Sequence, residues 1–495
     1  MTPLEVLKAS SFGRRTAEEE HDHLQQYFVE TEQWTKVFSG DVDIIYGPKG
    51  SGKSAIYSLI IKNEATLFDR GVLIVPGENP QGAPAFQHLR DDTPDGEFEF
   101  VSLWKLYVLT LCGQSIKSYG FKSKKAQQVV QALEDAGLLP THFTLSKIVK
   151  YVLEYVRQNS SVEAVENSMQ FDPVTGTPVG VANKIYLREP SSIQAKLGAV
   201  SIDELYQVAN DALKEEGIQI WIVLDRLDVA FTDKPTLEDE ALKALFKFYL
   251  DTKGSSQIRP KIFLRTDIWQ SITKQGFREA SHIERSKTIT WKEADLINLV
   301  VRRLLSNQAI CEYYNADKAA ILSDFKKQTD FIYRVFPDQV DSGGNKPSTM
   351  TWILSRTADG TKESAPREVI HLLNELREEQ ISRLERGESF PQGERLFEQV
   401  TFKEALPAVS KVRLEQTIFA EFPDERPFVE ALTEQKATHT TPTLAKLWSV
   451  EEAEASKIVG RLLEIGVLEK QGAFWRVPFL YRPALSSIQG SADDA

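Results

Sequence analysis

The sequence predicts an α/β fold with a parallel sheet as its core, a mainly helical region after it and a small three-helix module near the C-terminus. Three observations carry this prediction. A loop rich in glycine and lysine joins an apolar run to a helix-like pattern in residues 44–68. Two further apolar runs, at residues 220–224 and 262–264, end abruptly in charged residues. Beyond residue 414, helix-like patterns precede two short strand-like runs around Gly472.

The composition is that of an ordinary folded chain. Of its 495 residues, 41% are hydrophobic and 26% charged, and this length predicts about three domains. No apolar run approaches the roughly 20 residues of a membrane span, and the first residues lack the apolar core of a signal peptide. The two cysteines fit neither a disulfide framework nor a metal-ligand spacing. We therefore expect a cytoplasmic protein with reduced thiols and no membrane partner.

The loop within "IIYGPKGSGKSAIYS" matches the pattern Gly-x-x-x-x-Gly-Lys-Ser. A strand-like run precedes it and a helix-like pattern follows it, which is the context that this motif requires. Glycines let backbone N–H groups wrap a polyphosphate, Lys53 can reach the β- and γ-phosphates, and the Ser54 hydroxyl can ligate Mg²⁺. The loop therefore predicts a site for ATP and Mg²⁺ formed by Gly47, Pro48, Lys49, Gly50, Ser51, Gly52, Lys53, Ser54 and Ala55.

A second constellation follows from "IQIWIVLDRLD", residues 218–228. Its apolar run is typical of a central parallel strand, and Asp225 stands at the carboxyl end, where open α/β sheets bind ligands. We expect Asp225 to hold the metal together with Ser54. Asp228 follows three residues later.

A third strand is predicted in "RPKIFLRTDIW", residues 259–269, which turns polar at Arg265, Thr266 and Asp267. A polar residue at this strand end can sense the γ-phosphate or orient water. The sequence does not decide which of the three does so, and Arg265 is included among the catalytic candidates.

In this order, "GPKGSGKS", "IVLDRLD" and "KIFLRTD" resemble the AAA+/STAND side of the P-loop ATPases. They are similar in particular to a poorly characterised bacterial P-loop ATPase family, whose members share "YFVET", "GPKGSGKSA", "DRLD" and "LRTDIW". The resemblance covers residues 12–367. It implies a helical lid and a winged helix after the core, oligomerisation, and a role in bacterial stress or anti-phage signalling.

The resemblance also implies residue roles. Pro366 and Arg367 open a helix-like pattern and resemble the second sensor of AAA+ proteins, whose arginine reaches the γ-phosphate. Many AAA+ ATPases place a glutamate after the metal aspartate as catalytic base, but Arg226 occupies that position here. The two alternatives for the base are Asp228 and Glu78, which lies in "LIVPGENP". The sequence is as consistent with slow, switch-like hydrolysis as with fast turnover.

An arginine that reaches a neighbouring subunit's γ-phosphate is also implied. Arg278 and Arg285 follow the third strand, the region from which AAA+ subunits supply such an arginine. Ordinary surface arginines are the alternative interpretation.

These patterns predict a P-loop core over residues 1–290 with an insertion at about 95–210, a helical lid at 291–410, a winged helix at 411–485 and a disordered tail at 486–495. A hairpin is expected within the insertion, in residues 168–187.

The winged helix does not carry the charge of a typical DNA reader. The formal net charge of the chain is −12, and residues 426–482 hold eight cationic and seven acidic residues. Glu451, Glu452 and Glu454 begin the third helix of the module, where a recognition helix would meet phosphates. We expect a protein-docking or lid-locking role, with any DNA contact made by Lys470 and Arg476 of the wing.

The sequence thus favours an ATP-driven molecular switch that oligomerises and controls a separate partner protein. A DNA-loading ATPase of the replication or transposition type is the first alternative. A transcription regulator that uses nucleotide only as a ligand is the second.

Overall fold

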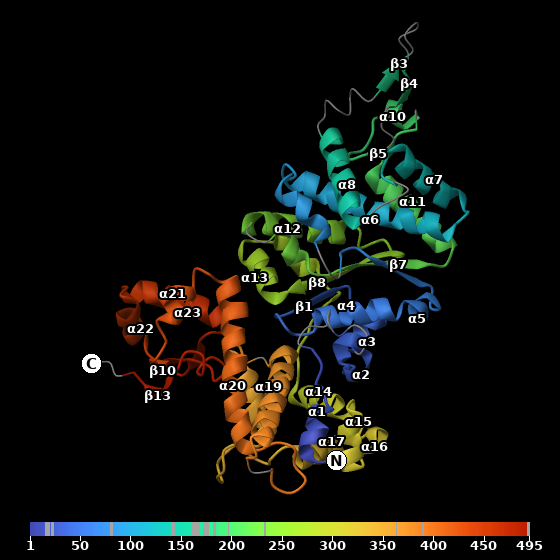
Figure 1. Ribbon diagram of the computed structural model, residues 1–495. Helices are drawn as coiled ribbons and strands as arrows, with labels where there is room; N and C mark the ends of the chain where they lie inside the picture. The colour runs from blue at the N-terminus through green and yellow to red at the C-terminus, as the bar shows by residue number, and fades with distance from the viewer. Residues whose placement is uncertain are drawn as a thin grey trace. The chain divides into compact units, whose positions relative to one another are not determined.

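The computed structural model describes residues 1–14, 20, 24–79, 83–139, 144–160, 169–171, 178–181, 185–196, 198–231, 234–362, 364–388 and 391–492 (Figure 1). The chain forms two compact units. The first comprises Met1–Thr31, Lys49–Gly52 and Thr290–Ala495, and the second comprises Glu32–Pro48 and Lys53–Ile289. None of the described helices combines the length and apolar character that a membrane span requires.

The second unit is built on a five-stranded parallel sheet. Its order is β2 (Val72–Pro76), β7 (Gln219–Leu224), β8 (Ile258–Arg265), β1 (Ile44–Gly47) and β9 (Ser286–Thr288). The three central strands, β7, β8 and β1, are rich in Ile, Val and Leu and buried over most of their length, as parallel strands covered on both faces are. Because the strands are parallel, the residues after β1, β2, β7 and β8 all emerge at one edge of the sheet.

Helices cover both faces of this sheet (Figure 1). One face carries α4 (Lys53–Lys62) and α5 (Glu64–Phe68), and the other carries α12 (Pro235–Asp251) and α13 (Thr266–Lys274). Shorter elements complete this part of the unit: α3 (Glu32–Phe38) and the 3₁₀ turns η3 (Leu227–Phe231) and η4 (Arg278–His282).

The insertion between β2 and β7 is mainly helical, as predicted. Its elements are η2 (Ala85–Arg90), α6 (Glu97–Tyr119), α7 (Lys124–Asp135), α8 (Leu145–Asn159), β3 (Met169–Phe171), β4 (Pro178–Val181), β5 (Ile185–Tyr186), α10 (Ser192–Lys196), β6 (Val200–Ser201) and α11 (Ile202–Glu215). Helix α6 shares one hydrophobic core with the sheet, and the Trp104 indole donates a hydrogen bond to the Ala241 carbonyl of α12. Strands β3 and β4 pair as the predicted hairpin, whose turn residues 172–177 lie outside the described residues.

The helices of the first unit include those expected of the lid in residues 291–410, together with two from residues 1–31, which the sequence analysis placed in the core. They are α1 (Pro3–Lys8), α2 (Leu24–Tyr27), α14 (Glu293–Leu305), α15 (Gln308–Tyr314), α16 (Lys318–Leu322), α17 (Phe325–Val335), α18 (Thr349–Thr357), α19 (Pro366–Glu385), α20 (Gln399–Arg413) and the π-helical turn η5 (Leu414–Phe419). The N-terminal segment joins this unit through a buried ion pair between Arg303 and Glu20, with Nη2 and Oε2 2.8 Å apart. Arg377 of α19 also donates to the Leu7 carbonyl of α1.

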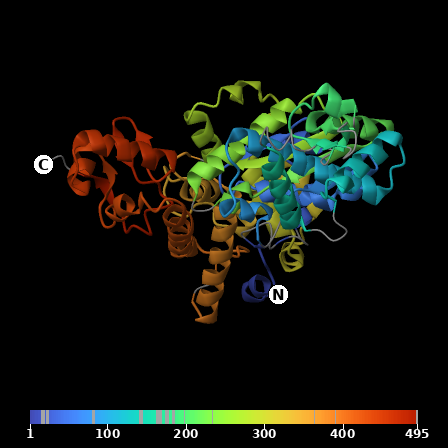
Figure 2. The same cartoon turned by 90° about the horizontal axis from the view of Figure 1, so that it is seen from above.

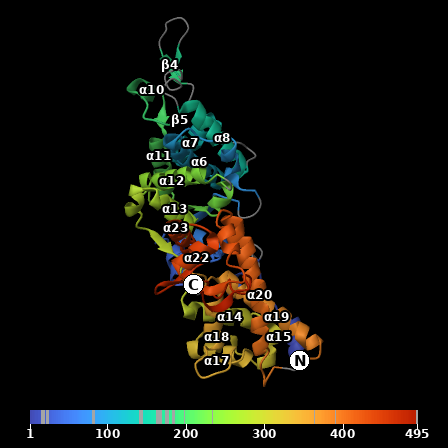
Figure 3. The same cartoon turned by 90° about the vertical axis from the view of Figure 1, so that its left-hand side faces the viewer.

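The C-terminal module is a winged helix, as predicted (Figures 2 and 3). It contains α21 (Arg426–Glu430), β10 (Lys436–His439), α22 (Thr441–Trp448), α23 (Glu452–Glu464), β11 (Glu469–Gln471), β12 (Phe474–Arg476) and β13 (Ile488–Ser491). Thr440 caps α22 by accepting a hydrogen bond from the backbone N–H of Thr443. With the parallel sheet, the helical insertion and the helices of the first unit, this module confirms the fold class that the sequence predicts.

The prediction that the tail is disordered from residue 486 is wrong for residues 488–491. Strand β13 extends the sheet of the module, in the order β11-β12-β10-β13. The backbone N–H groups of Ile488 and Ala492 donate to the carbonyls of Gln435 and Thr438, each over 2.8 Å. Main-chain pairing of this kind depends little on side chains, so a small, polar sequence can still join an open sheet edge.

Gly360 provides a test of the packing within the first unit. A Cβ at this position would meet the Leu468 carbonyl oxygen and lie 2.8 Å from the Gly466 carbonyl oxygen. We expect Gly360→Ala to lower the free energy of unfolding by about 2 kcal/mol, because the backbone must shift to relieve the overlap. Gly460→Ala is the control, since its Cβ meets nothing within 4 Å and alanine favours a helix. Equal melting temperatures for the two variants would contradict the close approach.

Candidate nucleotide-binding site

The glycine loop lies between β1 and α4, where the sequence predicts it. Lys53 opens α4, and its Nζ donates to the carbonyl oxygens of Gly47 and Pro48 over 2.7 and 3.0 Å. Burial lowers the pKa of Lys53 to about 8, against the opposing effect of Asp225 and Asp228. In the described part of the chain no carboxylate forms an ion pair with this ammonium, so an anionic ligand would offset the cost of burying it.

Ser54 and Asp225 come together as the predicted metal pair. The Asp225 side chain follows β7, is 5% exposed and lies close to the Ser54 hydroxyl. Burial raises the pKa of Asp225 to about 6, while Ser54 and Lys53 lower it. Among the described residues, no group of three or more His, Cys, Asp or Glu side chains could hold a metal. One hydroxyl and one carboxylate suit Mg²⁺, which keeps several waters and takes further ligands from phosphates.

Glu78 occupies the end of β2 and has the properties of a proton acceptor. Its side chain is 2% exposed, and its Oε1 accepts hydrogen bonds from the backbone N–H groups of Asn79 and Ala85 over 2.7 and 2.6 Å. Its Oε2 is buried and has no hydrogen-bond partner among the described residues. Burial raises the pKa of Glu78 to about 7, near the value that suits a general base at neutral pH.

Asp228, the other candidate base, is engaged differently. The Nη1 of Arg265 lies 3.6 Å from its Oδ2. Arg265 also donates from Nε and Nη2 to the carboxylate of Asp267, over 3.1 and 2.6 Å. Between these two residues, the Thr266 hydroxyl is buried without a hydrogen-bond partner among the described residues. Of the three sensor candidates, Thr266 therefore has the hydroxyl that a ligand or water could use.

Glu238 is a half-buried acid of this region that the sequence analysis missed. It lies in the first turn of α12, and its Oε1 is buried without a hydrogen-bond partner among the described residues. Burial, followed by the charge of Asp228, raises its pKa to about 8. In the sequence it is one of several acids in "PTLEDE", and only the fold distinguishes it from its neighbours.

The tip of the glycine loop, Lys49–Gly52, belongs to the first unit together with Arg367. Gly50 has a φ of +83°, and a Cβ there would lie 3.0 Å from the Cβ of Arg367. Trp291 donates from its indole to the Ser51 carbonyl over 2.8 Å. The Ser51 hydroxyl and the Arg367 Nε are both buried with no hydrogen-bond partner among the described residues. Unpartnered donors at a glycine cradle are consistent with a polyphosphate ligand.

The two candidate arginine fingers lie in different surroundings. Arg278 is exposed at the start of η4. Arg285 immediately precedes β9, where its Nε donates to the Asp43 Oδ2 over 2.8 Å and its Nη2 donates to the Gly40 carbonyl. The side chain of Arg285 is 37% exposed and lies at the amino ends of the strands, whereas the glycine loop follows the carboxyl end of β1. The reach of either arginine to a second subunit stays a prediction.

No protein-family model matches the chain, and a search of curated proteins finds no match either. Among solved structures, the chain is similar to the Aeropyrum pernix ORC1 protein in complex with DNA, with a TM-score of 0.36 and 12% identity over 96% of both chains. It is also similar to the Aeropyrum pernix ORC2 protein in ADPNP–ADP complexes, with a TM-score of 0.28 and 11% identity over 92% of both chains. TM-scores below 0.5 neither place the chain in a family nor assign it a function.

Glu78 and Asp228 can be separated by their effect on hydrolysis. If Glu78 is the base, Glu78→Gln should lower the rate of ATP hydrolysis by about 10²-fold or more and leave ATP affinity nearly unchanged. The wild-type rate should rise as the pH passes through about 7, because the base acts in its ionised form. This rising limb should be absent from the residual activity of Glu78→Gln.

Asp228→Asn is the matched variant. Its carboxylate faces Arg265, so we expect a smaller loss of rate and a retained pH limb near 7. A full rate in Glu78→Gln together with a collapsed rate in Asp228→Asn would assign the base to Asp228 instead.

Proposed function

We propose that this chain binds ATP with Mg²⁺ and hydrolyses it slowly, as a molecular switch that controls a partner. The observation that carries the proposal is the proximity of the Ser54 hydroxyl to the buried Asp225 carboxylate, beside a half-buried Lys53. A glycine loop alone supports phosphate binding. The Ser54 hydroxyl and the Asp225 carboxylate lie close together next to the glycine loop, and they add the ligand pair that metal-assisted phosphoryl transfer requires.

The residues divide the work between binding and chemistry. Lys53 neutralises the β- and γ-phosphates, and Ser54 and Asp225 hold the metal. When bound, Mg²⁺ would withdraw charge from the phosphate oxygens. Glu78 accepts the proton of the attacking water at its free Oε2, and Thr266 orients that water or the γ-phosphate. Arg226 stands directly after Asp225, at the position where many AAA+ ATPases carry the glutamate base. An arginine at this position is consistent with slow hydrolysis.

A chain of contacts within the first unit supports the switch. Arg367 opens α19 beside the loop tip, and Glu368 follows it directly. The Nη1 of Arg413, on α20, lies 3.0 Å from the Glu368 Oε1. Arg413 Nη2 also lies 3.2 Å from the Asp359 Oδ2, and the backbone N–H of the adjacent Gly360 donates to the Gly466 carbonyl of the winged-helix module. A movement of Arg367 toward a γ-phosphate would therefore be passed to α20 and to the winged helix through buried, paired groups.

The biological part of the proposal rests on the motifs. Oligomerisation, a separate effector protein and a role in bacterial stress or anti-phage signalling follow from the resemblance of the glycine loop and the strand ends to AAA+/STAND ATPases. Lys49 and Glu421, which form an ion pair, add a second contact through which the loop tip can act on the segment that leads into the winged helix.

Lys53→Ala tests nucleotide binding. Removing the ammonium should abolish most of the ATP affinity measured by calorimetry, because it deletes the buried cation of the loop. Lys62→Ala, at the exposed end of the same helix, should bind ATP as the wild type does. Unchanged ATP binding by Lys53→Ala would end the assignment of the loop to nucleotide.

A DNA-loading ATPase is the second candidate, and one cluster favours it. Arg356, Arg476 and Arg482 surround the Phe479 ring, with guanidinium carbons 4.3, 4.7 and 4.1 Å from its centroid. The Nη2 of Arg482 is buried without a hydrogen-bond partner among the described residues. Three clustered guanidiniums, from α18, from β12 of the wing and from the segment after it, can contact phosphates. The cations of α23 are already paired, Lys457 with Glu454 over 3.0 Å and Arg461 with Glu425 over 3.2 Å.

Fluorescence anisotropy of the full chain with a short duplex separates these surfaces. We expect weak binding that Arg476→Glu removes and that the double reversal Lys457→Glu and Arg461→Glu leaves in place. Submicromolar, steeply salt-dependent binding that the double reversal abolishes would show that α23 reads DNA. ATP hydrolysis stimulated by the duplex would favour DNA loading over protein docking.

A further inference from the structure

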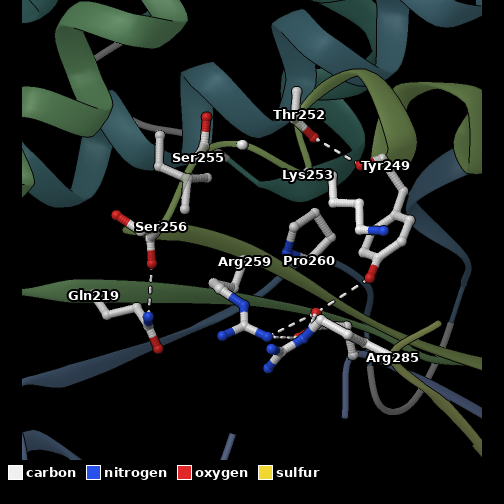
Figure 4. Close-up of a pocket in the computed structure, with 12 residues that line it drawn as sticks. Gln219, Tyr249, Thr252, Lys253, Ser255, Ser256, Arg259, Pro260 and Arg285 are labelled. Carbon is white, nitrogen blue, oxygen red and sulfur yellow. Dashed lines mark hydrogen bonds and ion pairs between the residues drawn. The ribbon is translucent and has the colours of Figure 1, made fainter. Parts of the chain in front are cut away.

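A pocket lies at the amino ends of the strands of the parallel sheet (Figure 4). It is a cavity of about 290 Å³ within the second unit. The loop Thr252–Ser256 forms one wall, and the starts of β7 and β8 with the residues just before β1 and β9 form the other. Because the sheet is parallel, these are the amino ends of its strands, so the pocket is separate from the nucleotide-binding edge.

One carboxylate organises the floor of this pocket. The Asp43 Oδ2 accepts hydrogen bonds from Arg259 Nη2, Arg285 Nε and Tyr249 Oη over 2.7, 2.8 and 3.2 Å. The Asp43 Oδ1 accepts from Lys261 Nζ over 2.9 Å. The Asp43 side chain is 4% exposed, so three cations share a single buried acid.

The pocket therefore holds more positive than negative charge. Its lining contains Lys253, Arg259 and Arg285 against Asp43 alone, and Lys261 lies behind it, fully buried against the Trp221 ring. In the part of the chain that the structure describes, Asp43 is the one acid in ion-pair contact with Arg259, Arg285 and Lys261. Lys253 pairs with the exposed Glu284 at 3.1 Å. The excess positive charge also affects Lys261. Burial, together with the charges of Arg259 and Arg285, lowers the pKa of Lys261 to about 8.

Such an arrangement is costly unless an anion completes it, because desolvated like charges repel one another and lack counter-charge. Arg259 uses Nη2 for both Asp43 and the Gly40 carbonyl, which leaves its Nη1 and Nε for another acceptor. Its side chain is 16% exposed, so these donors lie where a small ligand can reach them but bulk water is largely excluded. Ser255 and Ser256, on the opposite wall, add hydroxyl groups.

We propose that this pocket binds a small phosphate-bearing anion, held by Arg259 and Arg285 on one side and by Lys253 and the Ser255–Ser256 loop on the other. Guanidinium forks match phosphate oxygens in pairs, and lysine and hydroxyl donors supply the remaining contacts. A cavity of about 290 Å³ lies at the small end of ligand sites, so inorganic phosphate or a small phosphomonoester fits, whereas a nucleoside triphosphate does not. If the pocket binds no anion, Asp43 and its cationic partners serve only to hold β1, β8 and β9 together.

The test measures inorganic phosphate binding to the full chain by calorimetry, at constant ionic strength in chloride. The protein carries Lys53→Ala, so that the glycine loop contributes no phosphate affinity. We expect one saturable phosphate per chain. In the same background, Arg259→Gln should weaken binding about tenfold or more, since it removes a charge-assisted donor pair.

Lys253→Gln keeps the proposal testable if Arg259→Gln does not fold, because its ion pair is with the exposed Glu284 rather than with Asp43. This variant should weaken phosphate binding about threefold or more. Lys150→Gln is the matched control, an exposed lysine paired with a glutamate on α8, and should bind phosphate unchanged. Absent saturable binding, or equal affinity in Lys253→Gln and Lys150→Gln, would overturn the proposal. If the pocket cations retain duplex DNA and the chain binds no phosphate, the proposal is overturned and the pocket is part of a nucleic-acid-binding surface.

Discussion

The close approach of Ser54 to Asp225 is the contact on which the site depends. It joins the first turn of α4 to the end of β7, although β8 lies between β7 and β1 in the sheet. Lys53, Ser54 and Asp225 keep their relative positions only while these two elements stay together. A parallel sheet provides this constraint because all of its carboxyl ends lie at one edge.

The site retains ionisable groups that burial disfavours in their charged forms. Burial raises the pKa values of Asp225, Glu78 and Glu238 and lowers the pKa of Lys53. A carboxyl whose folded pKa is raised costs stability when it ionises. For Glu78 the folded chain holds the proton more tightly between pH 4.5 and about 7, so stability falls as the pH rises through that window. A protein selected for stability alone would replace such groups, so their presence together supports a catalytic edge.

The sequence predicted what depends on local chemistry. Gly47–Ser54 and Asp225 can be recognised because each motif lies directly beside its apolar run in the sequence. The winged helix can be recognised from its helix caps and its glycine turn. The rest depends on contacts between distant residues. The partner of Arg285 is Asp43, 242 residues away, and Glu238 acquires its burial only when α12 packs on the sheet. Strand β13 was missed because its pairing depends on the open edge of β10 and not on its own side chains.

The central claim is that Asp225 and Ser54 hold Mg²⁺ at an ATP-occupied loop. The most direct measurement is the rate of ATP hydrolysis as a function of Mg²⁺ concentration for the wild type and Asp225→Asn, at saturating ATP. The account predicts that Asp225→Asn still binds ATP but needs about tenfold more Mg²⁺ for half-maximal rate, or loses hydrolysis altogether. An Asp225→Asn protein with the wild-type rate and the wild-type Mg²⁺ dependence would contradict it.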